Sequence, residues 1–476
     1  MPIFRKFFDF EQSGEDVAIE SRLLLSGSLA TGSFVTVLHG NCWSHWVAYK
    51  RMTGIETSQN VLFFAFYYLP DNTSGVQRAV RMAKYLPRNG FCTHVVSSSY
   101  HGQQLDIPNT VHVPSQSTER MVSRACSRLV DGVQRVLPYN EQLPWVAHAI
   151  AAARESMAEK PFSAVISTSP PVGPHLAAMY MKWRYGLKWI ADFRDPLLGN
   201  PGRARRWARP YDIALERAIF RSADAIIAVT DAVEAGWRKK YPQWAHKFKV
   251  IWNGFDPEDG FGPKPIPPRP HRVLAHIGVL YTQRYPARLL ASLERLLERN
   301  LVDPKSIRIK LLGIVQDESV FVKNPTAAGL VEKGVLEFRN ELIPRRDAML
   351  EIATSDYLLL IDIDNLSNVA YTVPAKIYDY ILTGRPVLGI TRRNSPVDRI
   401  LSRSGVQQVC LYQEDSDGEI DRKLLGFLRM SSEPVSPSPW FLRNFDGQQQ
   451  ASVLADLMRS LVGVAGPSKP FAEALG

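Results

Sequence analysis

The chain has few cysteines and no two of them close together. Its four cysteines, Cys42, Cys92, Cys126 and Cys410, are scattered over 476 residues, and no C-x-x-C motif occurs. This spacing disfavours both a disulfide framework and a structural zinc site, and it fits a reducing compartment. We therefore expect a cytoplasmic protein.

Long apolar runs are also missing. No apolar segment reaches the roughly 20 residues that a membrane-spanning helix needs. The mild apolar run at 23–38 contains Gly, Ser and Thr, follows an acidic stretch, and lies late for a signal peptide.

Several motifs of catalysis and phosphate binding are absent. The sequence has no H-E-x-x-H, no G-x-S-x-G and no G-x-x-x-x-G-K-[ST], and the first expected glycine loop lacks the G-x-G-x-x-G pattern. Asp362 and Asp364 supply two carboxylates after an apolar run, but a dedicated metal cage usually needs more oxygen ligands. We expect no metal and no cofactor.

What the chain does contain is typical of a globular protein of two domains. Hydrophobic residues make up 45% of it and charged residues 22%, and 476 residues are too many for one ordinary core. The net charge of +10 fits three kinds of partner: nucleic acid, an anionic membrane face, or phosphorylated small substrates.

From residue 59 onward, apolar runs of strand length alternate with helical patterns. VLFFAFYYL (61–69) is followed by a polar turn, a helical pattern at 76–86 and a second apolar run, THVVSSS (93–99). This order predicts a parallel, doubly wound sheet. Further strands are expected at 164–169, 188–193, 224–230 and 248–256, and in a second series at 272–278, 307–313, 335–340, 356–362 and 386–391.

The position of a proline-rich segment and of a terminal helix predicts the domain boundaries. GFGPKPIPPRPHR (260–272) is the segment richest in proline, and it is typical of a linker. A terminal amphipathic helix is expected at 447–462, with Val453, Leu454, Leu457 and Leu461 on one side. We predict an α/β protein of two doubly wound Rossmann-like domains facing a cleft. The expected parts are an extension at 1–58, domains at 59–259 and 272–440, a linker at 260–271, a crossover helix segment at 441–463, and a tail at 464–476.

Two candidate loops lie in the first domain. In PDNTSGVQR (70–78), Gly75 would allow the main chain to approach a ligand closely, although an ordinary turn explains it equally well. In WIADFRDPL (189–197), Asp192, Arg194 and Asp195 follow an apolar strand, where side chains of this fold class face the ligand. The alternative for this group is a surface salt-bridge cluster.

Two more candidates lie in the second domain. In HIGVLYTQRYP (276–286), Gly278 permits close approach and Arg284 is a candidate phosphate ligand, unless it is simply a solvated loop arginine. In TVPAKIYDYILTGRP (372–386), Thr372 is expected to cap a helix that Gly384 ends. Lys376 and Asp379 lie three apart on it, and the simplest interpretation is an intrahelical ion pair.

Together these stretches resemble glycosyltransferase family 4, the nucleotide-sugar transferases of the GT-B fold, from about residue 60 to 462. The resemblance implies an acceptor-side first domain, a donor-binding second domain, a final helix crossing back to the first domain, retention of configuration and no metal. It places Arg284 on the donor diphosphate, Asp379 on the ribose, Gly75 near the donor phosphates, and Arg194 and Asp195 near the sugar-transfer centre. Gly278 and Lys376 complete the expected donor site.

The sequence departs from the family pattern at four positions. Many members have two glutamates eight positions apart, where this chain has Tyr371 and Asp379. Val279 stands where many have a second phosphate-binding arginine, and Arg194 stands in place of a histidine. A sugar-nucleotide epimerase and a non-catalytic GT-B scaffold therefore stay open as alternatives.

The basic surplus bears on the expected partners. Nucleic acid is not expected, because aromatic and basic residues are not interleaved as in stacking platforms. The surplus would suit a sugar or lipid-linked acceptor at the inner face of an anionic membrane, or anionic substrates alone. We expect a role in cell-surface polysaccharide or glycolipid biosynthesis.

Overall fold

The computed structural model describes residues 59–71, 75–99, 106–115, 142–198, 209–281, 284–319, 323–362 and 373–463, which lie in one compact unit. The expectations for 1–58, 464–476, Asp364, Tyr371 and Thr372 lie outside the described residues.

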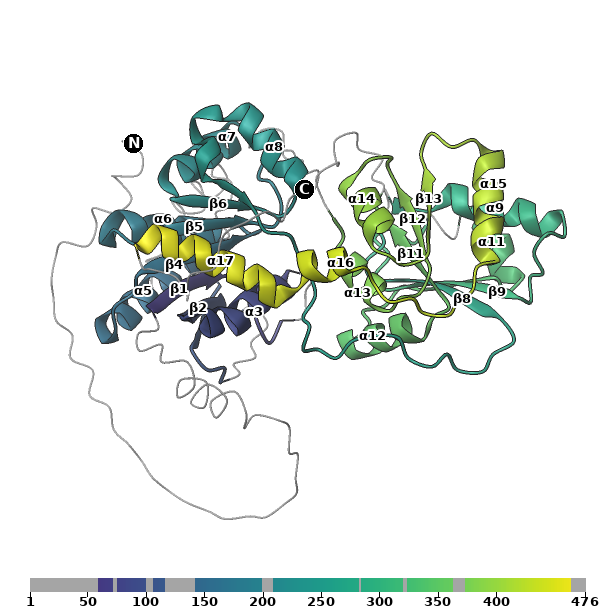
Figure 1. The fold of residues 1–476 in the computed structure, drawn as a ribbon, viewed down its shortest axis with the longest axis horizontal. Helices are drawn as coiled ribbons and strands as arrows, with labels where there is room; N and C mark the ends of the chain where they lie inside the picture. The colour runs from purple at the N-terminus through teal and green to yellow at the C-terminus, as the bar shows by residue number, and fades with distance from the viewer. Residues whose placement is uncertain are drawn as a thin grey trace, which may run out of the picture. The chain divides into compact units, whose positions relative to one another are not determined.

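The first part of the chain forms a parallel sheet in the order β3-β2-β1-β4-β5-β6-β7 (Figure 1). Its strands are β1 (Gln59–Ala65), β2 (Phe91–Ser98), β3 (Thr110–Val113), β4 (Ala164–Ser169), β5 (Lys188–Phe193), β6 (Ala225–Ala228) and β7 (Phe248–Val250). Its helices are α3 (Val76–Tyr85), α5 (Leu143–Glu159), α6 (Gly173–Tyr185), α7 (Arg209–Ser222) and α8 (Asp231–Lys240).

The second part forms a parallel sheet in the order β10-β9-β8-β11-β12-β13. Its strands are β8 (Arg272–Ile277), β9 (Ile307–Leu312), β10 (Leu336–Arg339), β11 (Tyr357–Ile361), β12 (Val387–Thr391) and β13 (Gln408–Tyr412). The helices are α9 (Ala287–Glu298), α11 (Pro325–Glu332), α12 (Arg345–Thr354), α13 (Lys376–Leu382), α14 (Pro396–Arg403), α15 (Asp417–Leu428), α16 (Pro439–Phe445) and α17 (Gly447–Val462). The predicted fold, two doubly wound Rossmann-like domains, is confirmed, while the cleft stays a prediction.

Both sheets reverse their strand order once. In the first sheet the chain moves outward from β1 to β3 and returns to the other side of β1 with β4. In the second sheet β8 and β11 form the same switch. Ligands of open α/β sheets bind at the carboxyl ends of the strands at such a switch point. The loops after β1, β4, β8 and β11 are therefore where a site is expected.

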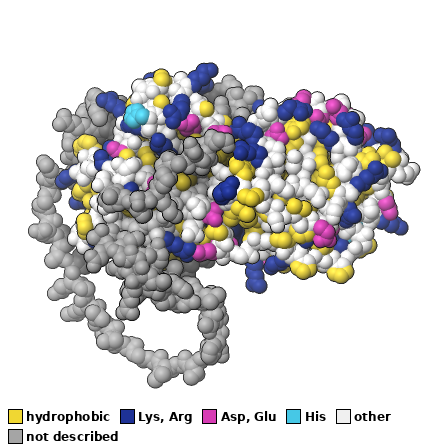
Figure 2. Space-filling model, viewed as in Figure 1, with side chains coloured by type: hydrophobic (Ala, Val, Ile, Leu, Met, Phe, Trp, Pro, Cys, Tyr) yellow, Lys and Arg dark blue, Asp and Glu magenta, His cyan; other side chains and the backbone are white. Residues whose placement is uncertain are grey.

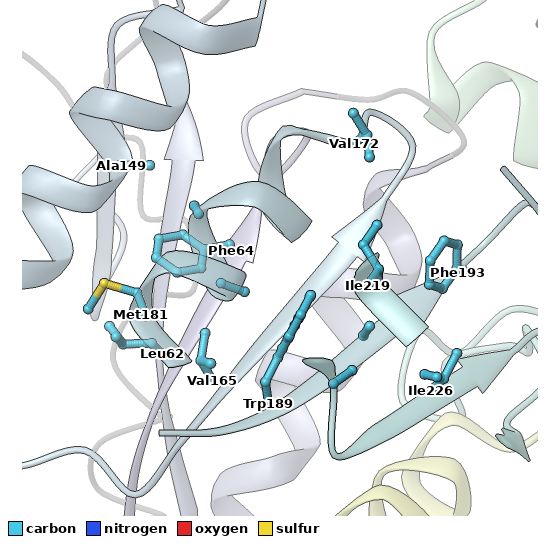
Figure 3. Packing of buried hydrophobic residues seen from close by; sticks show 14 of the residues in the cluster. Leu62, Phe64, Ala149, Val165, Val172, Met181, Trp189, Phe193, Ile219 and Ile226 are labelled. Carbon is cyan, nitrogen blue, oxygen red and sulfur yellow. The ribbon is translucent and has the colours of Figure 1, made fainter. Parts of the chain in front are cut away.

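Central strands such as β1 and β11 are largely apolar because both faces of each sheet are covered. In β1, Leu62 and Phe64 pack into one core and Val61 and Phe63 into the other. Figure 3 shows the first of these cores, where Phe64, Val165 and Trp189 project from three neighbouring strands. This two-sided burial explains why a run such as VLFFAFYYL shows no polar alternation.

The last helix returns to the first domain, as predicted (Figure 1). Leu454, Ala455 and Met458 of α17 are fully buried in one cluster with side chains of β1 and β2. Asp446 caps the helix by accepting hydrogen bonds from the main-chain N–H groups of Gln448 and Gln449. The expectation for Val453 is wrong, because its side chain is 43% exposed.

Other differences are local. Strands β3 and β13 were not predicted, and the first strand ends at Ala65 instead of Leu69. Helix α13 begins at Lys376, with Ala375 as its N-cap. Gly384 follows its end with a φ of 67°. Among the described residues, no helix is long and apolar enough to cross a membrane.

Candidate functional site

Arg194 joins three loops at the carboxyl edge of the first sheet. It follows β5, and its guanidinium donates hydrogen bonds to the main-chain oxygens of Gly75, Ser169 and Pro170. Gly75 lies in the loop after β1, and Ser169 and Pro170 lie at the end of β4 and directly after it, on the two sides of the switch point. Burial lowers the pKa of Arg194, and the nearby carboxylates of Asp192 and Asp195 oppose this shift. Three of its five N–H groups therefore serve the main chain.

Gly75 is required for this arrangement. A Cβ atom at position 75 would lie 2.0 Å from Nη1 of Arg194, closer than any real contact. The guanidinium is held by three carbonyls, so it cannot easily move aside. The glycine therefore makes room for an arginine of its own chain.

Of the three charged residues Asp192, Arg194 and Asp195, Asp192 forms its ion pair with a residue outside this segment. Asp192 is fully buried on β5 and pairs with Arg78 of α3, with a shortest N–O distance of 2.7 Å. It also accepts a hydrogen bond from Thr168, and Arg78 donates to the carbonyls of Ile251 and Trp252. Asp192 is thus part of a buried network. Arg78 lies within the quoted stretch PDNTSGVQR, but its partner is 114 positions away, so nothing local indicated its role.

The second sheet brings together residues from both sides of its own switch point. Gly278 directly follows β8, and its φ of 118° lies in the region that favours glycine. A Cβ atom there would be 3.0 Å from Nζ of Lys376, so the ammonium lies against this glycine. Nζ is also 3.2 Å from Nε2 of the buried His276. The sequence interpretation missed His276, although it stands in the quoted stretch HIGVLYTQRYP.

Lys376 and Arg284 form a cationic pair of side chains. Both are half-buried, and neither makes an ion pair with another residue in the described part of the chain. Burial, together with the charge of Arg284, lowers the pKa of Lys376 to about 7. A desolvated ammonium beside a guanidinium is unfavourable in the empty protein, and an anion would relieve that cost.

The expected ion pair between Lys376 and Asp379 is not formed. Lys376 approaches His276 and Gly278, whereas the charges that act on Asp379 are those of Arg345, Arg81 and Asp259. Burial raises the pKa of Asp379 to about 6, and the two arginines oppose this shift. The two side chains of α13 therefore have separate surroundings, and the simple interpretation is wrong.

Asp362 is a further polar residue at this edge. It follows β11, accepts a hydrogen bond from Thr391 through Oδ2, and its buried Oδ1 has no partner in the described part of the chain. Burial raises its pKa to about 6, against the opposing charge of Arg284. Within the described ranges, no group of three or more His, Cys, Asp and Glu side chains could hold a metal ion.

The carboxyl of Asp379 gives a test that depends on pH. Because its pKa is raised from 3.8 to about 6 in the folded protein, ionisation of Asp379 opposes folding. This cost is absent below about pH 4, grows as the pH rises to about 6, and is fully present above it. We expect Asp379→Asn to raise the melting temperature relative to the wild type at pH 7.5, and less so at pH 4. A difference that is equal at both pH values would contradict the raised pKa.

Comparison with known proteins supports the fold of two Rossmann-like domains. Residues 74–259 match the model of Glycosyltransferase Family 4, which confirms the resemblance over this part of the chain. No curated protein matches the chain in sequence.

Several solved structures share its architecture. Sucrose-phosphate synthase from Thermosynechococcus elongatus is 11% identical, with a TM-score of 0.55, over 85% of this chain and 99% of that one. HepE from Anabaena in complex with UDP and glucose is 14% identical, with a TM-score of 0.52, over 85% and 100%. The catalytic domain of starch synthase IV from Arabidopsis thaliana, bound to ADP and acarbose, is 9% identical, with a TM-score of 0.52, over 86% and 100%. At these identities the likeness establishes the fold.

Proposed function

We propose that this chain, a protein of GT-B fold whose residues 74–259 match glycosyltransferase family 4, is a glycosyltransferase that moves a sugar from a nucleotide-sugar donor to an acceptor hydroxyl. The observation that carries the proposal is the pair of cations at the switch point of the second sheet. Neither Lys376 nor Arg284 forms an ion pair with a residue of the described ranges, and the ammonium of Lys376 lies against Gly278. A diphosphate matches this arrangement in charge and in hydrogen-bond acceptors.

Charge is the main difficulty of the reaction. The bond between the anomeric carbon and the diphosphate oxygen breaks, so the sugar becomes oxocarbenium-like and the leaving diphosphate gains negative charge. Fixed cations at the diphosphate lower the energy of that state more than that of the bound donor. In the proposal Lys376 and Arg284 supply these cations, Gly278 admits the phosphates, and Asp379 accepts hydrogen bonds from the ribose.

The first sheet has a different part in the proposal. In the proposal, Arg194 organises the loops after β1 and β4, with Gly75 near the donor phosphates, and Asp195, in the loop after β5, lies near the sugar-transfer centre. Arg194 acts by holding main chain, since three carbonyls already take its N–H groups. Retention of configuration belongs to the same proposal, and NMR of the anomeric proton in the first-formed product would test it.

The acceptor and its location are further parts of the proposal. A sugar or lipid-linked acceptor at the inner face of an anionic membrane would suit the net charge of +10. On the face that Figure 2 shows, however, basic side chains are interspersed with acidic and apolar ones instead of forming one patch. The excess of basic residues therefore favours small anionic substrates at least as much as an anionic membrane.

A binding panel followed by a turnover assay tests the function. Thermal shifts with UDP, ADP, GDP and their sugar conjugates identify a ligand, because binding to the folded state raises the melting temperature. Incubation with labelled nucleotide sugars and candidate acceptors then separates the alternatives. Transfer to an acceptor with release of free nucleoside diphosphate supports a transferase, an isomerised sugar nucleotide supports an epimerase, and binding without turnover supports a scaffold.

Two substitutions test the donor site. We expect Arg284→Ala and Asp379→Ala each to weaken binding of the nucleoside diphosphate about tenfold, as loss of a hydrogen bond to a charged group does. Neither should lower the melting temperature of the free protein appreciably, since neither residue has an ion-pair partner in the described part of the chain. Arg422→Ala is a suitable control, because the Arg422 side chain is 74% exposed. Unchanged affinity in both variants would refute the assigned site.

A further inference from the structure

His276 occupies an unusual place beside the two cations. It is the last but one residue of β8 and only 2% exposed. Its Nδ1 lies 2.9 Å from the main-chain oxygen of Leu359 on the neighbouring strand β11. A carbonyl can only accept a hydrogen bond, so Nδ1 carries the proton. The neutral ring must then present a lone pair at Nε2.

The surroundings of His276 keep the ring neutral. Burial is the largest cause that lowers its pKa well below the ordinary value, followed by the charge of Lys376 and, more weakly, that of Arg284. The main chain at Leu359 and Val279 acts in the opposite direction. With two cations nearby and no carboxylate among its neighbours in the described residues, the imidazole stays a hydrogen-bond acceptor through the neutral pH range.

That acceptor faces the ammonium of Lys376. Nζ lies 3.2 Å from Nε2, and this is its one protein acceptor in the described part of the chain. Gly278 also lies against the ammonium, since a Cβ atom there would be 3.0 Å from Nζ. A lysine side chain has four rotatable bonds, so one fixed contact at its end removes much of its freedom. Two N–H groups of the ammonium are left for a ligand.

We propose that His276 is a positioning residue of the donor site, which holds the ammonium of Lys376 against Gly278 so that its two other N–H groups meet the phosphates of a nucleoside diphosphate. The inference rests on the proposed function and adds to it a residue that acts through another. Its chemistry requires a neutral imidazole with its proton on Nδ1.

Two substitutions separate the two nitrogens of the ring. In His276→Asn the amide N–H can replace Nδ1–H toward Leu359, but no atom reaches the place of Nε2. In His276→Gln the amide oxygen can replace Nε2 toward Lys376. We expect His276→Asn to weaken binding of the nucleoside diphosphate and of inorganic pyrophosphate about tenfold. His276→Gln should bind more tightly than His276→Asn, and the affinity of the parent nucleoside should not change in either.

A double-mutant cycle with Lys376→Met tests whether His276 acts through the lysine. Affinities for UDP, ADP, GDP and pyrophosphate are measured by calorimetry in the wild type, both single variants and the double variant. If the proposal holds, His276→Asn has no further effect once Lys376 is replaced. An equal loss in both backgrounds, or equal loss of nucleoside and diphosphate binding, would show a structural role and overturn the proposal.

The outcomes also separate this inference from the proposed function. If the wild type binds none of the diphosphates, the donor site itself is wrong and both proposals fall. If the wild type binds one of them and His276→Asn binds it equally well, the glycosyltransferase proposal stands and the role of His276 is refuted. Melting temperatures of all variants show whether each is folded. If His276→Asn is misfolded, the role of His276 is judged from the affinity of His276→Gln for the diphosphate relative to that of the wild type.

Discussion

Replacing Asp192 by alanine is expected to lower the free energy of unfolding by about 3–5 kcal/mol, the usual cost of breaking a buried ion pair by removing one partner. The Arg78 guanidinium would stay buried without its counter-ion, since both side chains of the pair are almost fully buried. Thr168 would lose its acceptor as well. The damage therefore comes mainly from the charge that is left behind.

Denaturant unfolding, followed by circular dichroism, measures this loss. Asp231→Ala is a matched control, because it breaks an ion pair with Arg399 of similar length in which both side chains are about half exposed. Exposed pairs contribute about 0–1 kcal/mol, so this control should unfold close to the wild type. The double variant Arg78→Met with Asp192→Leu should recover part of the loss. A stable Asp192→Ala protein that had lost only activity would instead place Asp192 in the site.

Replacing Lys376 by methionine is expected to weaken binding of the nucleoside diphosphate by about ten- to a hundredfold, the range for hydrogen bonds to a charged group. The free protein should not be destabilised, because the lowered pKa of Lys376 shows that its positive charge is unfavourable in the empty fold. Lys376→Met should thus lower the affinity for the diphosphate without lowering the stability of the free protein. Such a separation is common where the residues of a binding site reduce the stability of the fold.

Calorimetry with the diphosphate and with its parent nucleoside measures the effect. Lys310→Met is a suitable control, since Lys310 is also a partly buried lysine of the second domain but pairs with Glu351 at 2.5 Å. Its diphosphate affinity should equal that of the wild type. If Lys376→Met bound diphosphate normally, or lost nucleoside binding equally, the cation would have no part in phosphate binding.

The sequence predicted the fold because the fold depends on local patterns. Runs such as AVISTS and KWIADF coincide with β4 and β5, since a strand buried on both faces is mostly apolar and therefore stands out from its polar flanks. The short edge strands β3 and β13 have only one neighbouring strand, and their sequences, TVHV and QVCLY, carry too weak a pattern to be recognised. The last helix was found with its bounds, 447–462, because its apolar stripe is regular.

The site was less accessible from the sequence, because its contacts join distant residues. The spacing of Lys376 and Asp379 predicted an ion pair, but Lys376 contacts His276 of β8, and the arginine charges that act on Asp379 come from α12 and α3, which no local pattern reveals. Arg194 was expected to face a substrate, and its hydrogen bonds to three carbonyls became visible only once the loops were assembled. His276 was missed because a single buried histidine in a strand has no signature.

The return of α17 to the first sheet has a consequence for how the protein is made. The ribosome delivers the first domain from its N-terminal end, but Leu454, Ala455 and Met458, which complete one of its cores, emerge only after the second domain. Until then the apolar surface over β1 and α3 lacks its cover, and exposed surfaces of this kind favour aggregation and chaperone binding. The first domain therefore reaches its final packing only after the second has been synthesised. A nascent chain that stalls before residue 447 lacks α17, so the core of its first domain stays incomplete.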